Sequence, residues 1–262
     1  MFSMSRVSFI LVVVTGLASC SSDSDNSDDD KHVVTISHSF NESMGSFSPN
    51  VLLGVLHDQA LHDEHQVKLQ TLPSPYEYRK GLNFKWPYSY PFEIDDISGS
   101  LGASLSAQIS GLTPLTRYSV SFEMTILSNV PDVCPDSYGA IGNGINFYSS
   151  VYLQEPIVKS YYASVMNLSE FMAEGVILSV SPSSDTDRVL LGDLAIPILC
   201  QSYDPNNNWE SKVLTGEKDG IYTADESGQG WLYFAVDSSY EAIFNTNTEF
   251  YITNLDVTFR EL

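Results

Sequence analysis

The amino-acid sequence predicts an all-β protein: an antiparallel two-sheet β-sandwich of the jelly-roll type that follows a disordered N-terminal leader. Many short segments alternate between apolar and polar residues, which is the period of a strand with one face on a core. Gly, Pro, Asn and Asp gather between these segments, as they do in turns. No stretch keeps a helical period with caps, and the best helix candidate is short, residues 167–173.

The clearest strand lies within residues 112–127, LTPLTRYSVSFEMTIL. Pairing should begin after Pro114 because proline has no N–H to donate. The polar side of this strand consists of Arg117, Ser119, Ser121, Glu123 and Thr125. We interpret this segment as an inner strand that specifies the scaffold, and we expect any activity to lie in the loops. Its apolar side consists of Tyr118, Val120, Phe122, Met124 and Ile126.

No strand is predicted in two segments. Residues 73–92 contain so many Pro and Tyr that they predict a long aromatic loop, and residues 201–230 are polar and rich in turn residues. Residues 231–236 are apolar on both faces, which is typical of a strand at the centre of a sandwich. Further strands are expected within residues 33–40, 41–56, 67–70, 105–109, 145–153, 176–180, 189–191 and 250–259.

Residues 1–19 have the features of a secretory signal. Arg6 supplies positive charge, and residues 7–14 are an apolar run too short to span a bilayer as a stable anchor. The following residues 17–20, LASC, resemble the lipobox of bacterial lipoproteins. This resemblance implies that Cys20 is lipidated and that the protein is anchored in the outer membrane, since Ser21 rather than Asp follows the cysteine. An ordinary signal peptide that ends near a cysteine is the alternative.

The lipidated cysteine and an acidic tether make up residues 20–31. The run SSDSDNSDDDK has no apolar residue, so it cannot bury surface to offset chain entropy and should be disordered. Acidic runs at this place resemble surface-export signals of lipoproteins in the Bacteroidota, so the periplasmic and the cell-surface faces of the membrane both remain open. Residues 32–262 are then expected to form a single β-sandwich domain.

The charge balance argues against nucleic acid as a partner. The chain has 33 acidic and 12 basic residues and a formal net charge of −21, whereas binding to phosphates needs Lys and Arg. Such a charge suits a secreted protein that stays soluble through self-repulsion, or one that holds divalent cations such as calcium.

The cysteines predict a disulfide. With Cys20 assigned to the lipid, Cys134 and Cys200 form an even pair in an oxidising compartment, and both lie in turn-rich segments that contain proline. We predict a bond between them that stabilises the domain by about 3–5 kcal/mol on the loop-entropy model. Two free thiols are the alternative.

Several motifs resemble carbohydrate-binding modules. Residues 110–124, SGLTPLTRYSVSFEM, look like a strand of jelly-roll modules of this class, and residues 250–259, FYITNLDVTF, look like their final strand. Segments between them, such as LLGDLA, are similar to uncharacterised secreted bacterial β-sandwich proteins, although Ala140, Ile141 and Asn143 depart from their glycine-rich loop. The resemblance covers most of residues 100–260 and implies a fold more than a function.

One acidic motif points to a glycoside hydrolase but is incomplete. Residues 93–97, EIDDI, resemble the catalytic strand of laminarinase-like enzymes, in which Glu93 and Asp95 would be the nucleophile and its helper. Ser98 stands where the general acid should be, and a retaining mechanism needs two carboxyls about 5 Å apart. We therefore assign no catalytic residue and favour a protein that is not an enzyme.

Two segments carry candidate metal ligands, and no other cofactor is expected. His57, His62 and His65 lie among acids in one polar segment, which could hold a transition metal or simply be an exposed acidic loop. A second segment resembles a calcium loop, but Trp209 stands where the EF-hand turn needs Gly. Its oxygen ligands would be Asp204, Asn206 and Asn208.

Aromatic residues in loops give the main indication of function. Sugar rings stack on aromatic faces, so an aromatic loop is typical of a glycan-binding surface; the alternative is that the rings cover a sheet edge. The first hypothesis is a non-catalytic cell-envelope lipoprotein that binds glycan or another extracellular ligand. The alternatives are a polysaccharide-active enzyme and a structural or adhesion component. The aromatic candidates are Trp86, Tyr88 and Tyr90 in the proline-rich loop, Trp209 in a second loop, and Tyr148 and Tyr152 on the outward face of their strand.

Overall fold

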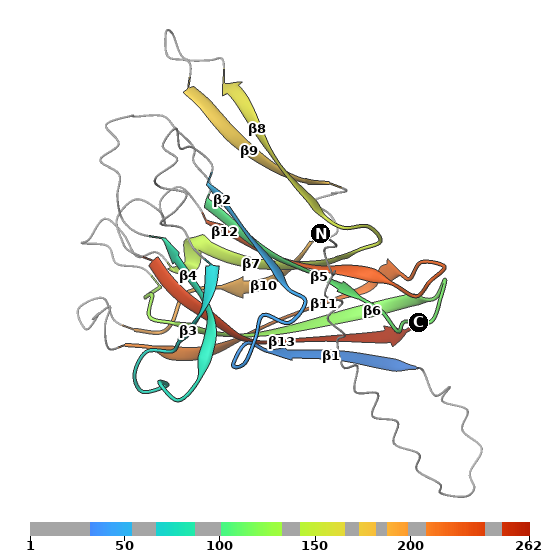
Figure 1. Cartoon of the computed structure of the whole chain (residues 1–262), viewed down its shortest axis with the longest axis horizontal. Helices are drawn as coiled ribbons and strands as arrows, with labels where there is room; N and C mark the ends of the chain where they lie inside the picture. The colour runs from blue at the N-terminus through green and yellow to red at the C-terminus, as the bar shows by residue number, and fades with distance from the viewer. Residues whose placement is uncertain are drawn as a thin grey trace, which may run out of the picture.

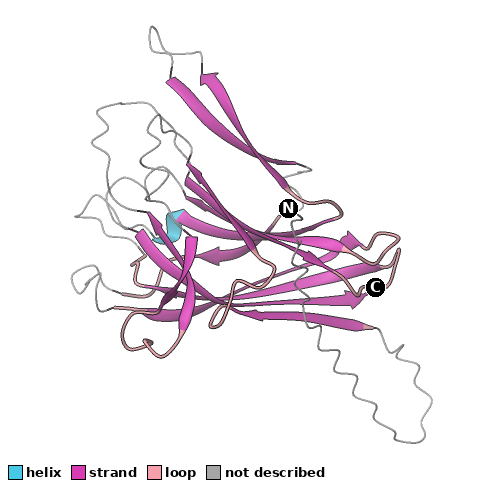
Figure 2. Cartoon of the chain, in the orientation of Figure 1, coloured by secondary structure: helices cyan, strands magenta, loops and turns pink. Residues whose placement is uncertain are grey.

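The computed structural model confirms the predicted fold class. It describes residues 32–53, 67–86, 101–132, 142–165, 173–181, 188–198, 208–238 and 248–262. Within these ranges two antiparallel sheets face each other, and the only helical element is the short 3-10 turn η1 (Gly142–Gly144) (Figures 1 and 2). In this part of the chain, no helix has the length and apolarity needed to cross a bilayer.

The first sheet has six strands, and its central strand is β13. The long strand β13 pairs with β6 along one edge. Along its other edge, β4 pairs with the first part of β13 and β1 pairs with the second part. A bulge between Ile252 and Asn254 separates the part of β13 that pairs with β4 from the part that pairs with β1. The strands are β11 (Glu210–Thr223), β6 (Arg117–Ser128), β13 (Thr248–Glu261), β4 (Lys80–Trp86), β3 (Val67–Thr71) and β1 (Val33–Ser39).

The second sheet has five strands, with β12 at its centre. The chain crosses from sheet to sheet at nearly every step, as β4 to β7 and β10 to β13 show, which is the connectivity expected of a jelly roll. A separate hairpin of β8 (Ile157–Val165) and β9 (Ala173–Ser181) follows β7. The strands of the second sheet, in spatial order, are β10 (Val189–Asp193), β7 (Ile145–Tyr152), β12 (Gly230–Ser238), β5 (Leu101–Ile109) and β2 (Ser48–Leu53).

Aromatic side chains from both sheets meet in the core. Phe122 of the first sheet contacts Phe234 of the second edge to face, with ring centroids 6.2 Å apart. Phe250 and Phe147 make a similar pair at 5.3 Å. All four rings are almost completely buried, so the alternating pattern predicted for residues 112–127 is confirmed as the core-facing side of β6.

The prediction for residues 231–236 is also confirmed. They form β12, which pairs with β5 and β7 on its two sides. Phe234 faces the main core, whereas Tyr233 and Ala235 belong to a second apolar cluster on the outer side of the sheet. Both faces of the strand are therefore covered, which explains its continuous apolar run.

Two expectations drawn from the sequence are wrong, because two segments in which no strand was predicted contain one. Residues 73–92 are not a loop throughout, because Lys80–Trp86 form β4 in the first sheet. Pro73 and Pro75 fall in the turn before this strand, so the strand itself needs no proline. Residues 201–230 contain β11, whose alternation is hidden by Gly216. A Cβ on Gly216 would lie 2.5 Å from Val189, so only glycine fits where the second sheet comes this close.

Other calls from the sequence lie outside the described residues. These are the leader and tether of residues 1–31 with Cys20, the proposed disulfide of Cys134 and Cys200, the acids of residues 93–97, and residues 167–172 of the helix candidate. They stay predictions, as does the division into leader, tether and single domain.

Candidate functional site

The structure places few of the residues singled out from the sequence. Trp86 is the last residue of β4 and pairs with Thr248 of β13, while Tyr88 and Tyr90 lie outside the described residues. Asn208 is half-buried just before β11. The other candidate metal ligands, His57, His62, His65, Asp204 and Asn206, also lie outside the described residues.

Trp209 is not the exposed loop aromatic that the sequence suggests. Its side chain is only 7 % exposed, and its ring lies edge to face against Tyr251 at 5.4 Å. Leu72 and Leu127 complete this small cluster on the outer side of the first sheet, with Tyr76 packed against it. The expectation of an exposed ring is wrong because the turn after β3 brings Leu72 and Tyr76 onto this side of the sheet.

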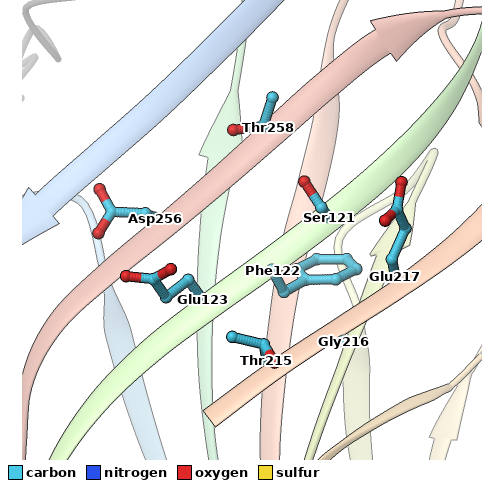
Figure 3. Close-up of a pocket in the computed structure, with 8 residues that line it drawn as sticks. All are labelled: Ser121, Phe122, Glu123, Thr215, Gly216, Glu217, Asp256 and Thr258. Atoms are coloured by element: carbon cyan, nitrogen blue, oxygen red, sulfur yellow. The ribbon is translucent and has the colours of Figure 1, made fainter. Parts of the chain in front are cut away.

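An open depression lies on the outer side of the first sheet, over β6, β11 and β13 (Figure 3). Its volume is about 460 Å³. Except for Phe122, whose ring belongs to the core, and Gly216, the lining side chains are carboxylates and hydroxyls, and none is basic. The polar lining consists of Ser121 and Glu123 of β6, Thr215 and Glu217 of β11, and Asp256 and Thr258 of β13.

Strand register brings these side chains together. Glu123 lies directly opposite Asp256 on one side and Thr215 on the other. Two residues earlier on β6, Ser121 lies opposite Thr258 of β13 and Glu217 of β11. Because residues two apart share a face of a strand, all six side chains project from the same surface. Figure 3 shows the Glu123 and Asp256 carboxylates on the same side of their strands, with Glu217 apart from them.

The Glu123 and Asp256 pair is electrostatically unfavourable in the free protein. Like charges at directly opposite positions of an antiparallel pair destabilise the sheet. Within the described ranges neither carboxylate has a hydrogen-bond or ion-pair partner that would offset the repulsion. The depression therefore presents carboxylate oxygens that are free to accept hydrogen bonds from a ligand.

A second group of polar side chains lies near the end of β4. Glu249 accepts hydrogen bonds from the Asn83 amide at 2.7 Å and from the Tyr251 hydroxyl at 3.0 Å. Lys85 lies 3.7 Å from its other carboxylate oxygen. Burial and the neighbouring Glu249 carboxylate raise the pKa of Tyr251 well above its usual range, so this hydroxyl stays a donor. These contacts hold the beginning of β13 in place, and the Glu249 carboxylate is occupied by Asn83, Tyr251 and Lys85.

A third surface is formed by aromatic rings on the outer side of the second sheet. Tyr148 and Tyr152 lie there, as predicted for the outward face of their strand, together with Tyr233 and Trp231. Tyr152 is nevertheless only 6 % exposed, so outward orientation does not mean contact with water. The guanidinium of Arg188 lies 4.2 Å from the centre of the Tyr148 ring.

Sequence reasoning missed the depression, although a signal for it exists. Glu123 and Asp256 each occupy the polar side of an alternating strand, which alone is the ordinary pattern of a solvated face. The two strands that carry them are the two with the clearest alternation in the chain. Pairing these strands in antiparallel register would have placed the two carboxylates opposite each other.

The arrangement supplies hydrogen-bond acceptors. In the described part of the chain, no three His, Cys, Asp or Glu residues are grouped as a metal site would need. Two opposite carboxylates can accept several hydrogen bonds at once from a ligand rich in hydroxyl groups.

These observations define a two-sheet β-sandwich protein with an acidic depression on one outer face. No protein-family model matches the chain, and neither does any curated protein sequence. Among solved structures, the chain is similar to the K1 cleaved adhesin domain of Lys-gingipain from Porphyromonas gingivalis W83. The two share 11% identity over 86% of this chain and 97% of that chain, with a TM-score of 0.33.

Two carbohydrate-binding modules are similar to the chain at the same level. TmCBM27, a carbohydrate-binding module that recognises mannan specifically, has a TM-score of 0.34 and 8% identity over 87% of this chain and 98% of that chain. TmCBM61, solved in complex with β-1,4-galactotriose, has a TM-score of 0.32 and 12% identity over 80% of this chain and 86% of that chain. All three TM-scores are below 0.5, so these similarities carry no argument about function.

Proposed function

We propose that this protein is a non-catalytic, lipid-anchored cell-envelope protein that binds a glycan in the depression on β6, β11 and β13. The observation that carries the proposal is the lining: three carboxylates and three hydroxyls project from one open surface, and none of the described residues that line it is basic. The lipobox resemblance at residues 17–20 supports the envelope location.

Sugar hydroxyls match this lining chemically. Each carboxylate accepts hydrogen bonds from hydroxyl donors, and such charge-assisted bonds contribute about 1.5–3 kcal/mol each. Hydroxyl donors would also spread the negative charge of Glu123 and Asp256, which repel each other in the free protein. The ligand should therefore be a neutral or amino sugar, because a uronate or sulfated glycan would add further negative charge.

The aromatic loop that begins near Trp86 is a second contact region in this proposal. Trp86 pairs with Thr248, eight residues before Asp256 along β13. At about 3.3 Å per residue, the two places are roughly 26 Å apart. Variants in the loop and in the depression therefore test different parts of the protein.

Binding can be tested with the full-length lipidated protein in detergent on arrays of neutral, amino and anionic glycans. The double variant Glu123→Gln with Asp256→Asn should lose at least tenfold in affinity for the glycan that the wild type binds, because charged acceptors become neutral. Glu155→Gln removes an exposed carboxylate after β7, on the other sheet, and should bind as the wild type does. Equal binding by the double variant, or no binding to any glycan, would overturn the proposal.

A polysaccharide-active enzyme is the second candidate. Directly opposite residues have Cβ atoms about 5 Å apart, which is near the carboxyl separation of retaining glycosidases. Release of reducing ends from a glycan, abolished by Glu123→Gln, would favour this candidate over simple binding. A structural or adhesion role would leave both assays negative.

A further inference from the structure

Strand β1 lies at the border of the first sheet. Among the described strands it pairs only with β13, and Figure 1 shows it along the border of that sheet. Every second side chain of β1 is exposed, and these side chains lie on the same outer side of the sheet as Asp256. The exposed residues are Val33, Thr35, Ser37 and Ser39. We call the side of β1 that faces away from β13 the β1 edge.

The main-chain polar groups of the four exposed residues point into the β1 edge. Glu261 donates its N–H to the carbonyl oxygen of His32 at 3.1 Å, and Phe40 donates its N–H to the carbonyl oxygen of Thr253 at 2.9 Å. In an antiparallel pair, residues that hydrogen-bond to the partner strand alternate with residues whose N–H and C=O groups point away from it. Because His32 and Phe40 bond to β13, the four exposed residues between them direct these groups away from β13.

The β1 edge lacks the features that commonly keep sheet edges from pairing with other chains. Edge strands of natural proteins carry Lys, Pro or bulges for this purpose. The sequence of β1, VVTISHS, contains no Lys, Arg, Asp, Glu or Pro, and its pairing with β13 has no register shift. Each other edge strand of the two described main sheets has at least one such feature: Pro49 in β2, Lys68 in β3, a register shift in β10, and Lys212, Lys218 and a register shift in β11.

One end of the β1 edge favours a basic side chain. Ser37 lies opposite Asp256, and Figure 3 shows the Asp256 carboxylate between β13 and the blue strand β1. Within the described ranges no cation pairs with this carboxylate, and Glu123 lies opposite it on β6. A strand added at the β1 edge would lie about 10 Å from β13, two strand spacings away. A Lys or Arg side chain that extends over the small Ser37 can cover this distance together with Asp256.

The other end of the β1 edge has the opposite charge. Arg260 lies opposite Val33 and is exposed, and no ion pair is described for it. A partner strand with a basic residue beside Ser37 and an acidic residue beside Val33 therefore complements both ends. In an antiparallel partner strand, the basic residue comes four positions before the acidic one.

We propose that the β1 edge binds an extended peptide segment of another protein as an additional antiparallel strand, with a basic residue beside Ser37 and an acidic residue beside Val33. Hydrogen bonds to the main chain of β1 supply affinity, and the two charges set the register. Apolar residues of the peptide cover Ile36, which is half-buried on the inner side of the strand. The net charge of −21 disfavours a second copy of the chain at this place. The inference does not depend on glycan binding.

A fluorescent peptide, TVKVTVEVT, tests the proposal with the full-length lipidated protein in detergent. Fluorescence anisotropy should show saturable binding, and the peptide TVEVTVEVT should bind at least fivefold more weakly because its first glutamate would face Asp256. Ser37→Pro removes one N–H from the β1 edge and no hydrogen bond to β13, and it should weaken binding at least tenfold. Ser37→Ala keeps this N–H and should bind within about twofold of the wild type. Absence of binding, or equal binding by Ser37→Pro, would overturn the proposal.

A second variant keeps the test decisive if Ser37→Pro disturbs the fold. Ser37→Lys places an ammonium opposite Asp256, where the partner's basic residue would lie, and should also weaken binding at least tenfold. Its thermal stability should equal or exceed that of the wild type, because opposite charges then face each other across two paired strands. Full affinity in Ser37→Lys would overturn the proposal. A dimer in analytical ultracentrifugation that Ser37→Lys abolishes would assign the β1 edge to a second copy and would overturn it as well.

Discussion

Removal of one charge from the Glu123 and Asp256 pair should stabilise the free protein while it weakens glycan binding. At the separation of about 5 Å typical of directly opposite residues, two unit charges repel by about 0.8 kcal/mol in water. Neither carboxylate has a compensating partner among the described residues. Glu123→Gln keeps the shape of the side chain and should therefore raise the free energy of unfolding by about 0.5–1 kcal/mol.

Urea unfolding followed by circular dichroism measures this gain. The midpoint should rise without a change in the slope, since the same surface is exposed on unfolding. The gain should shrink in 1 M salt, where the screening length is about 3 Å. Glu155→Gln should shift the midpoint less, because no ion pair or opposite carboxylate is described for Glu155. A loss of stability in Glu123→Gln, or a gain that salt does not reduce, would refute the electrostatic reasoning.

Three further predictions concern stability. Lys212→Met should lower the free energy of unfolding in urea by about 2–3 kcal/mol, because the Lys212 ammonium donates hydrogen bonds to two oxygens of Asp193, 2.6 and 2.9 Å away. Lys85→Met removes a more exposed ion pair and should lower it by less than about 1 kcal/mol. Burial lowers the pKa of His38, so the contribution of the neutral imidazole to the free energy of unfolding is fully present above pH 6.5 and is lost as the pH falls below that value. His38→Gln should remove this part of the pH dependence of the unfolding midpoint. Phe234→Ala should cost about 3–5 kcal/mol by calorimetric or urea unfolding, since its ring is 2 % exposed between the sheets.

The sequence predicts the fold where alternation is undisturbed. Strands β6 and β13 follow the apolar and polar pattern closely, and both lie at the centre of the first sheet. Strand β11 was missed because Gly216 replaces an inward apolar side chain where β10 comes close. Strand β4 was missed because the prolines of the preceding turn were counted with it. For β11, a contact with another element decides the residue type, and a local pattern does not contain that contact.

The candidate site could be predicted only in part, for a related reason. Glu123, Glu217 and Asp256 each look like ordinary solvated residues, because solvent exposure alone accounts for a polar side chain on an outer face. Their proximity depends on the register of three strands that are far apart in the chain. Trp209 shows the opposite case: its neighbours in sequence are polar, yet the turn that contains Leu72 and Tyr76 covers it.

The position of these residues on paired strands changes the expectation that activity lies in the loops. A side chain on a hydrogen-bonded strand has its backbone fixed before a ligand arrives, so binding there costs less conformational entropy than ordering a loop. Glu123 lies between two hydrogen-bonded neighbours, β11 and β13, and is among the most firmly placed polar groups of the first sheet. Glu123→Gln should therefore act mainly on the binding enthalpy that titration calorimetry measures, with little change in the entropic component. A loss of affinity that is mainly entropic would contradict this reasoning.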